Sequence, residues 1–223
     1  MATPEVRGPI DVEDGSVGTI WIDPGGALAS LVVAHGAGSG MDHPLLAGFC
    51  RAIADAGVAT MRFNFPYAER GRRSPDTERV LRKAWLAAFE AARAASDRPV
   101  LVGGKSLGGR IASMCVADGM PAAGLVFLGY PLHPPGRPER IRDEHLNRVE
   151  VPMLFLQGTA DPLARPELVA KVVRRLGDRA TLEKIEGGDH SFKVRGSLAD
   201  PREVGAGLAE LAAPFVRRVA SAR

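Results

Sequence analysis

Short apolar runs alternate with amphipathic helical stretches along most of the chain, and this alternation limits the fold more than any other feature. The expected strands span residues 17–23, 30–36, 58–65, 99–103, 122–130, 151–158 and 180–188. The expected helices span residues 44–57, 77–95, 107–115, 165–177 and 201–220. Repeated strand–helix units build a mainly parallel sheet that is covered by helices on both faces. The sequence therefore predicts an α/β fold.

The chain shows no internal division. Its 223 residues suffice for one domain with a sizeable core, and we find no repeat, low-complexity tract or linker. We predict a single domain over residues 1–223. The segment 131–150 joins two core strands and is rich in proline at its start. We expect it to form a short cap-like insertion, stiffened by proline and too small for a large mobile lid.

Composition excludes several classes of protein. The net charge is only +3 and the arginines are scattered, which argues against nucleic acid as the main partner. No apolar window reaches the roughly 18 residues of a membrane span, and the N-terminus has no apolar signal segment. Cys50 and Cys115 lie in apolar helical patterns, as reduced, packed thiols do. We expect a cytoplasmic protein without a membrane partner, and the oligomeric state stays open.

The stretch GGKSLGG, residues 103–109, has two possible meanings. A phosphate-binding P-loop needs a glycine five residues before Gly104, but that residue is Pro99. A nucleophile elbow, G-x-S-x-G, needs small residues around its serine because the backbone reverses there. Gly104 and Gly108 flank Ser106 at the required spacing, between an expected strand and an expected helix. The simpler alternative is a glycine-rich turn with an incidental serine.

A serine nucleophile needs a histidine as base and usually a carboxylate to orient it. Asp161 and His190 each follow a later expected strand, and the order Ser, Asp, His is typical of the elbow. Asp161 alone is also a common turn residue before proline. Asp189 is the weaker acid candidate because it is adjacent to His190. The other histidines near loops, for which surface or rim positions are the default, are His43, His133 and His145.

Acyl transfer also needs hydrogen-bond donors for the oxyanion, and backbone N–H groups serve well. One expected donor is the N–H of Leu107, where the start of the helix favours negative charge. The second is expected in the glycine-rich stretch HGAGSG, residues 35–40, with Ala37 as first choice and Gly38 as second. A plain flexible turn is the alternative for this stretch.

Several motifs together resemble one superfamily. They are VVAHGAG, RFNFPY, GGKSLGGR, GYPLHPPGRPE, LFLQGTADPL and GGDHSFK, and they span residues 32–193. The chain resembles small dienelactone-hydrolase-like members of the α/β-hydrolase superfamily, and within them the testis-expressed hydrolase-like proteins and their bacterial relatives. The resemblance implies that Ser106, Asp161 and His190 are nucleophile, acid and base, and that HGAG holds the oxyanion.

The leading hypothesis is a serine hydrolase that cleaves an ester, thioester or related acyl bond of a small molecule through an acyl-enzyme. It needs no cofactor, and no histidine pair has the spacing of metal ligands. The alternatives are a non-catalytic interaction scaffold and a small peptidase. Candidate substrate-binding residues are Lys105 beside the serine, Tyr67 after a strand, and His133 in the cap-like segment.

Basic residues raise a question about substrate charge. Lys105, the segment 67–76, Arg62 and Arg110 would favour an anionic acyl group if they faced the site. Charged side chains are mostly exposed, so solvated surface charges are the simpler interpretation.

Overall fold

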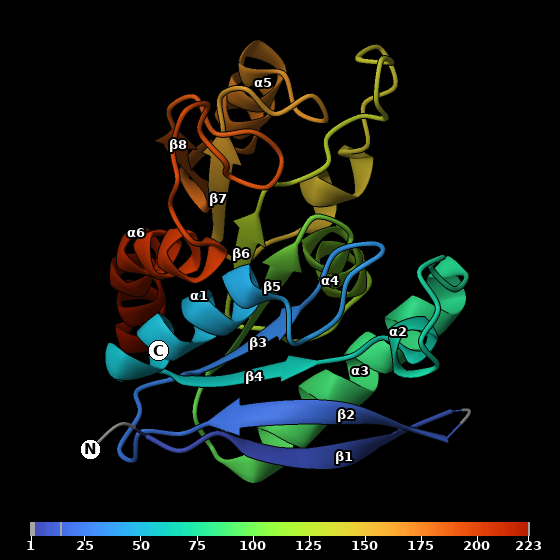
Figure 1. The fold of residues 1–223 in the computed structure, drawn as a ribbon, viewed down its shortest axis with the longest axis vertical. Coiled ribbons are helices and arrows are strands. Elements are labelled where there is room, and N and C mark those ends of the chain that lie inside the picture. The colour runs from blue at the N-terminus through green and yellow to red at the C-terminus, as the bar shows by residue number, and fades with distance from the viewer. Residues whose placement is uncertain (1–2, 14, 223) are drawn as a thin grey trace.

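The centre of the molecule is an eight-stranded sheet (Figure 1). The computed structural model describes residues 3–13 and 15–222. The strands are β1 (Val6–Val12), β2 (Gly15–Ile22), β3 (Ser30–Ala34), β4 (Ala59–Phe63), β5 (Val100–Lys105), β6 (Leu125–Leu128), β7 (Met153–Gly158) and β8 (Ala180–Ile185). Their order in the sheet is β1-β2-β4-β3-β5-β6-β7-β8. The pairs β1–β2 and β2–β4 are antiparallel, and the other pairs are parallel.

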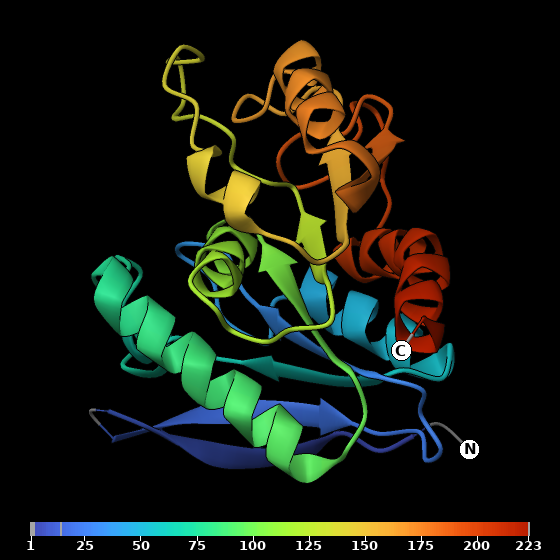
Figure 2. The same ribbon diagram turned by 180° about the vertical axis from the view of Figure 1, so that it is seen from behind.

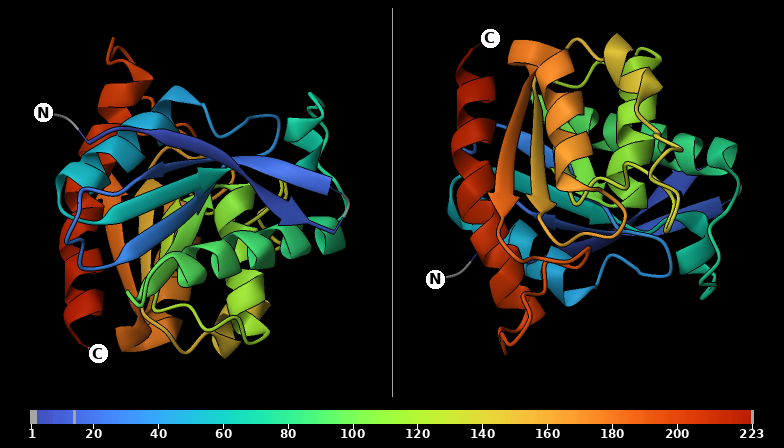
Figure 3. Two further views of the ribbon diagram at one scale, coloured as in Figure 1. Left: turned by 90° about the horizontal axis from the view of Figure 1, so that it is seen from below. Right: turned by 90° about the horizontal axis from the view of Figure 1, so that it is seen from above.

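Helices cover both faces of the sheet, as the sequence predicts. The long helices are α1 (Pro44–Asp55), α3 (Glu78–Ala95), α4 (Leu107–Ala117), α5 (Pro166–Leu176) and α6 (Pro201–Ser221). Figures 1 and 2 show opposite faces, with α1 and α6 together on one and α3 and α4 on the other. Figure 3 shows the same layers from the two ends. Among the described residues, no helix combines the length and apolar character that crossing a membrane requires.

The strand residues explain why both faces are covered. Along β3, Val32 belongs to the core beneath α3, α4 and α5, whereas Leu31 and Val33 belong to the core beneath α1 and α6. Side chains alternate between the two faces of a strand, so an unbroken apolar run supplies two cores at once. The free thiols divide in the same way, with Cys115 in the first core and Cys50 in the second.

Besides two short 3₁₀ helices, one strand and one α-helix were not predicted from the sequence. Strand β1 lies at the edge of the sheet, and its residues are exposed or half-buried. An edge strand needs no apolar run, and Pro9 is tolerated there because an edge has unpaired N–H positions. The other element is the short helix α2 (Pro66–Glu69), which begins with a proline in its first turn.

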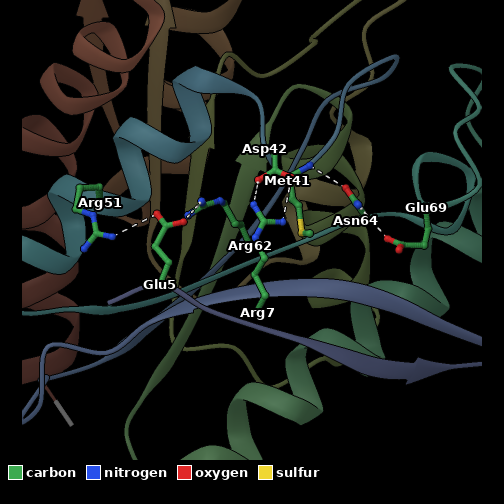
Figure 4. Close-up of polar contacts among 8 residues, drawn as sticks. All are labelled: Glu5, Arg7, Met41, Asp42, Arg51, Arg62, Asn64 and Glu69. Carbon is green, nitrogen blue, oxygen red and sulfur yellow. Dashed lines mark hydrogen bonds and ion pairs between the residues drawn. The ribbon is translucent and has the colours of Figure 1, made fainter. Parts of the chain in front are cut away.

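Ion pairs hold the N-terminal segment against the sheet (Figure 4). Glu5 accepts from Arg51 on α1 at 3.3 Å and from Arg62 on β4 at 2.9 Å. The Arg62 side chain is only 2% exposed, so its charge depends on this partner. Arg7 pairs with Asp42 at 2.5 Å, which ties β1 to the loop that follows β3.

The segment 131–150 packs beside α4 and α5. It contains the 3₁₀ helix η1 (Glu144–Arg148), and a second 3₁₀ turn, η2 (Gly177–Arg179), follows α5. Asp143 pairs with Arg175 of α5 at 2.6 Å, and His145 lies 2.8 Å from the hydroxyl of Ser113 on α4. Among the residues that the structure describes, none from this segment lines the pocket at Ser106.

Candidate active site

Ser106 lies on a sharp turn between β5 and α4. Its φ of 51° and ψ of −115° are unusual for a residue other than glycine, as expected at a strained elbow. Its N–H donates to the Leu128 carbonyl oxygen at 3.1 Å. A Cβ on Gly104 would lie 2.3 Å from the carbonyl oxygen of Ala34, and a Cβ on Gly108 would lie 2.4 Å from it. Either atom would clash with this oxygen. Both glycines are therefore required where β3 passes the turn.

A chain of hydrogen bonds joins the three predicted site residues. The Ser106 Oγ lies 2.8 Å from His190 Nε2, and the His190 Nδ1 lies 2.7 Å from Asp161 Oδ2. A carboxylate only accepts, so the Nδ1–H of His190 donates to Asp161. In the neutral ring Nε2 is then an acceptor, and the serine hydroxyl donates to it. This is the protonation pattern in which His190 can remove the serine proton.

The carboxylate of Asp161 is buried and fully partnered. Its Oδ2 also accepts from the Gln157 side-chain amide at 2.6 Å, and its Oδ1 accepts from the Leu163 N–H at 2.8 Å. Gln157 is itself oriented, since its side-chain oxygen accepts from the Tyr130 N–H at 2.8 Å. These bonds hold the carboxylate in place and fix the oxygen that faces His190.

Asp189 shapes the turn that carries His190. Its Oδ1 accepts from the N–H groups of Ser191 at 2.7 Å and Lys193 at 2.9 Å. The side chain is therefore engaged with its own loop, as aspartates in tight turns often are. Between the two carboxylates, it is Asp161 that contacts the His190 ring.

Two of the three predicted oxyanion donors border the serine. Leu107 is the first residue of α4, directly after Ser106, and Ala37 lines the pocket at the serine. Within the described chain, their N–H groups donate to no protein acceptor, which leaves them free for a ligand. Gly38, with φ of 70°, instead lines a neighbouring polar cavity.

His35 and Tyr67 support the glycine-rich loop, residues 35–40, that carries Ala37. His35 is fully buried, accepts from the Phe65 N–H at 3.0 Å through Nε2, and donates through Nδ1 to the Gly36 carbonyl oxygen at 2.8 Å. Burial lowers the pKa of His35 to about 4, so the ring is neutral. Tyr67 is also fully buried, and its hydroxyl donates to the same Gly36 oxygen at 3.2 Å. The prediction that Tyr67 binds substrate is therefore not supported, because packing turns it inward.

The far end of this loop is anchored to β4 and β2 (Figure 4). The Asn64 side-chain oxygen accepts from the Met41 N–H at 2.8 Å, and its amide nitrogen donates to Glu69 at 2.9 Å. Glu69 also accepts from the Gly18 N–H at 3.1 Å. The loop that carries Ala37 is thus held at both ends before any ligand arrives.

A pocket of about 300 Å³, which we call the serine pocket, opens beside the serine. It is lined by Gly36, Ala37, Ser39, His43, Leu45, Leu46, Lys105, Ser106, Leu163, His190 and Ser191. Its volume is at the lower end of the roughly 300–1,000 Å³ that is common for small-molecule sites.

Lys105 is a cation in the wall of the serine pocket. Burial lowers the pKa of its ammonium group to about 8, although the charges of Asp161 and Asp189 act in the opposite direction. Its Nζ lies 5.7 Å from the centre of the Phe192 ring. Lys105 therefore lines the serine pocket as a cation at neutral pH, and it loses its proton in mildly alkaline solution.

The remaining sequence-predicted candidates lie elsewhere. His133 is buried, accepts from the Arg165 N–H at 3.2 Å and contacts the Pro134 carbonyl oxygen, so it fastens a loop and does not face the serine pocket. Neither Arg62 nor Arg110 lines that pocket. The substrate-binding prediction for His133 is therefore not supported, because its ring nitrogens are used by the backbone.

Sequence reasoning missed several residues that shape the site. Leu45, Leu163 and Ser191 line the serine pocket, and Gln157 orients Asp161. His43 lines the pocket too, and its ring accepts from the Leu45 N–H at 3.3 Å at the start of α1. A histidine directly before proline at the end of the glycine-rich loop is the signal that could have identified it.

Comparisons with known proteins agree with this geometry. A family model described as "Alpha/beta hydrolase domain" matches residues 27–216. A serine hydrolase without a lid from Xanthomonas campestris is 20% identical with a TM-score of 0.75, over 98% of this chain and 96% of that one. Dienelactone hydrolase from Anabaena variabilis is 20% identical with a TM-score of 0.76, over 98% and 99%.

A third solved structure is Est1E from Butyrivibrio proteoclasticus with ferulic acid bound. It is 15% identical with a TM-score of 0.73, over 94% of this chain and 99% of that one. At these identities the likeness concerns the fold, whereas the family match covers most of the sequence. The protein belongs to the α/β-hydrolase family and is a hydrolase.

Proposed function

We propose that the protein cleaves an ester or thioester of a small molecule, with Ser106 as nucleophile, His190 as base and Asp161 as orienting acid. One observation carries the proposal: the hydrogen-bonded chain Asp161–His190–Ser106, with distances of 2.7 and 2.8 Å, in the wall of an open pocket. The nucleophile, the base and the group that orients the base are in mutual contact, as covalent acyl transfer requires.

The first half of the reaction forms an acyl-enzyme. Ser106 Oγ attacks the acyl carbonyl carbon while its proton passes to His190 Nε2. The resulting imidazolium is stabilised by the Asp161 carboxylate, which stays ionised. The tetrahedral intermediate then collapses, and His190 gives the proton to the departing alcohol or thiol.

The negative oxygen of the intermediate is held by the N–H groups of Ala37 and Leu107. Both are fixed before substrate binds, so little reorganisation is needed when charge develops. Gly38 is the less favourable donor, because Ala37 lines the serine pocket and Gly38 does not.

The second half releases the acid. A water molecule takes the place of the leaving group, His190 removes its proton, and the oxygen attacks the acyl carbon. Breaking the bond to Ser106 Oγ returns the proton to the serine.

Among the basic candidates, we retain Lys105 as a substrate contact. It lines the serine pocket beside the nucleophile, and its charge is available to an anionic group on the substrate.

The test is covalent labelling with a serine-directed fluorophosphonate, read by intact-protein mass spectrometry. We expect a single adduct on the wild type and none on Ser106→Ala. We also expect the variant to lose at least about 10⁴-fold in kcat with para-nitrophenyl acetate, because the nucleophile is gone. The folding control is a circular dichroism spectrum that matches the wild type.

A folded wild type that takes up no label and leaves the ester intact would refute the proposed function. An adduct that persists on Ser106→Ala would move the nucleophile to another residue.

A further inference from the structure

A second cavity opens next to the serine pocket. Its volume is about 570 Å³, and it shares His43, Leu45 and Ser191 with the serine pocket. It lies between the start of α1, the loop after β8 and the first half of α6. Its apolar walls come from Ile185, Phe192, Val194, Val204, Leu208 and Leu211. We call this cavity the apolar groove.

A glycine on α6 leaves unfilled space in the wall of the groove. Gly207 is exposed and lines the groove, and nothing lies within 4 Å of the position its Cβ would take. Leu211, one helical turn further along, is 42% exposed. Apolar surface in a hollow that joins a reactive serine is typical of a ligand site, whereas a single exposed leucine elsewhere needs no explanation.

Phe192 forms part of the wall between the two cavities. It is buried, and its φ of 62° is uncommon for a residue with a side chain. Its ring lines the groove and also lies 5.7 Å from the Lys105 ammonium group in the serine pocket. Lys105 does not line the groove; the charged side chain that does is Lys193, which is exposed.

The cavity on the other side of the serine pocket has a different character. It is lined by the loop 37–43 together with Asn64, Arg72 and Arg73, and its volume is about 680 Å³. An alkyl chain there would strip water from polar groups and gain few apolar contacts, from Ala37, Met41 and Ala68. In the apolar groove the same chain would leave water for leucine, valine and phenylalanine side chains.

We propose that the apolar groove binds the alkyl chain of the ester or thioester whose carbonyl group is held at Ser106. This inference rests on the proposed function and adds the substrate class: acyl compounds with a medium-length, unbranched hydrocarbon chain. The chain belongs either to the acyl group or to the alcohol, and the experiment below distinguishes these two sources.

The test fills the groove without touching the catalytic residues. Gly207→Phe places a ring in the open space, and replacing a glycine within a helix does not oppose helix formation. The matched control is Glu210→Phe, which adds the same ring to an exposed position of α6 outside the groove. One substrate series varies the acyl chain, as para-nitrophenyl acetate, butyrate and octanoate. A second series varies the alcohol, as ethyl, butyl and octyl acetate.

In the wild type we expect kcat/KM to rise at least about tenfold from the shortest to the longest chain in one series, because added methylenes leave water. Gly207→Phe should remove most of that rise and keep the wild-type rate with para-nitrophenyl acetate. Glu210→Phe should behave as the wild type. The series in which the rise occurs identifies whether the acyl or the alcohol chain occupies the groove.

The proposal is overturned if neither series shows a rise, or if Gly207→Phe retains the full rise. Both outcomes leave acetate hydrolysis and fluorophosphonate labelling intact, so they differ from failure of the proposed function, in which both of those signals are absent.

Discussion

Lys105 illustrates how one residue acquires a property from its surroundings. It is the last residue of the buried strand β5 and directly precedes the nucleophile, and it lines the serine pocket. Burial disfavours the charged form, and the pKa of the ammonium group falls from 10.5 to about 8. The residue is therefore charged at neutral pH and loses its charge in mildly alkaline solution.

At this scale we predict a pH-dependent preference for anionic esters. The ratio of kcat/KM for para-nitrophenyl hemisuccinate to that for the neutral, similarly shaped isocaproate should be highest below pH 8 and fall as the pH rises through about 8. We expect the fall to be about three- to tenfold, since the ion pair is partly exposed to solvent. Taking a ratio cancels the titration of the catalytic groups.

Lys105→Met is the control for this ratio. It should give a low ratio at all pH values, because the cation is absent. A wild-type ratio that stays constant between pH 6 and pH 10, on either side of the Lys105 pKa of about 8, would contradict the prediction.

The elbow is the element in which sequence and backbone geometry are most closely linked. Strand β3 passes so near the turn that Gly104 and Gly108 face the Ala34 carbonyl oxygen. Trp85 on α3 adds a further constraint, because its indole N–H donates to the Gly108 carbonyl oxygen at 3.0 Å. The turn is therefore held between β3, α3 and α4.

At the scale of the element we predict that Gly108→Ala lowers the free energy of unfolding by about 3 kcal/mol, since the methyl group would overlap backbone atoms that cannot move independently. Urea denaturation measures the effect. Gly207→Ala is the matched control, because its Cβ meets open space, and it should leave stability unchanged or raise it by about 0.5–1 kcal/mol. Equal stability of the two variants would argue against the tight turn.

On the scale of the whole molecule, the strand order gathers loops that are distant in sequence. The carboxyl ends of the parallel strands β3, β5, β7 and β8 lie on the same side of the sheet. The loops that follow them bring His190 to Ser106 across 84 positions of the chain. Active sites in open α/β sheets form on this side because the loops there converge. The serine pocket is therefore lined by segments that meet only when these strands lie in one sheet.

Two histidines, the buried His35 and the half-buried His145, connect global stability to pH. Burial lowers the pKa of both His35 and His145 from 6.5 to about 4. The unfolded chain therefore binds protons at these positions below about pH 6.5, while the folded protein does not until about pH 4. Stability is then fully present above pH 6.5 and falls as the pH drops towards 4.

We predict that His35 contributes at most about 3 kcal/mol to this loss, and that His145 contributes less because solvent screens its partly exposed ring. Urea denaturation at a series of pH values from 7 to 4 measures the dependence. His145→Gln keeps a polar partner for Ser113 and removes one titrating ring, so its stability should change less steeply with pH. An unchanged slope in this variant would exclude His145 as a contributor.

The sequence by itself determined the features that local patterns encode. Apolar runs and helical spacing identified the order of strands and helices, because periodicity follows directly from the geometry of each element. The spacing of Gly104, Ser106 and Gly108 identified the elbow. Asp161 and His190 could also be identified as candidate partners of the serine, since residues that follow parallel strands lie together at the carboxyl ends of those strands.

Tertiary structure alone decided where side chains point and which surfaces meet. Tyr67 and His133 follow strands as His190 does, yet packing turns them towards the backbone of neighbouring loops. Gln157 lies within an apolar strand, and its role appears only when Asp161 is beside it. The apolar groove joins α1, α6 and the loop after β8. Such juxtapositions depend on contacts between distant segments, which no local pattern records.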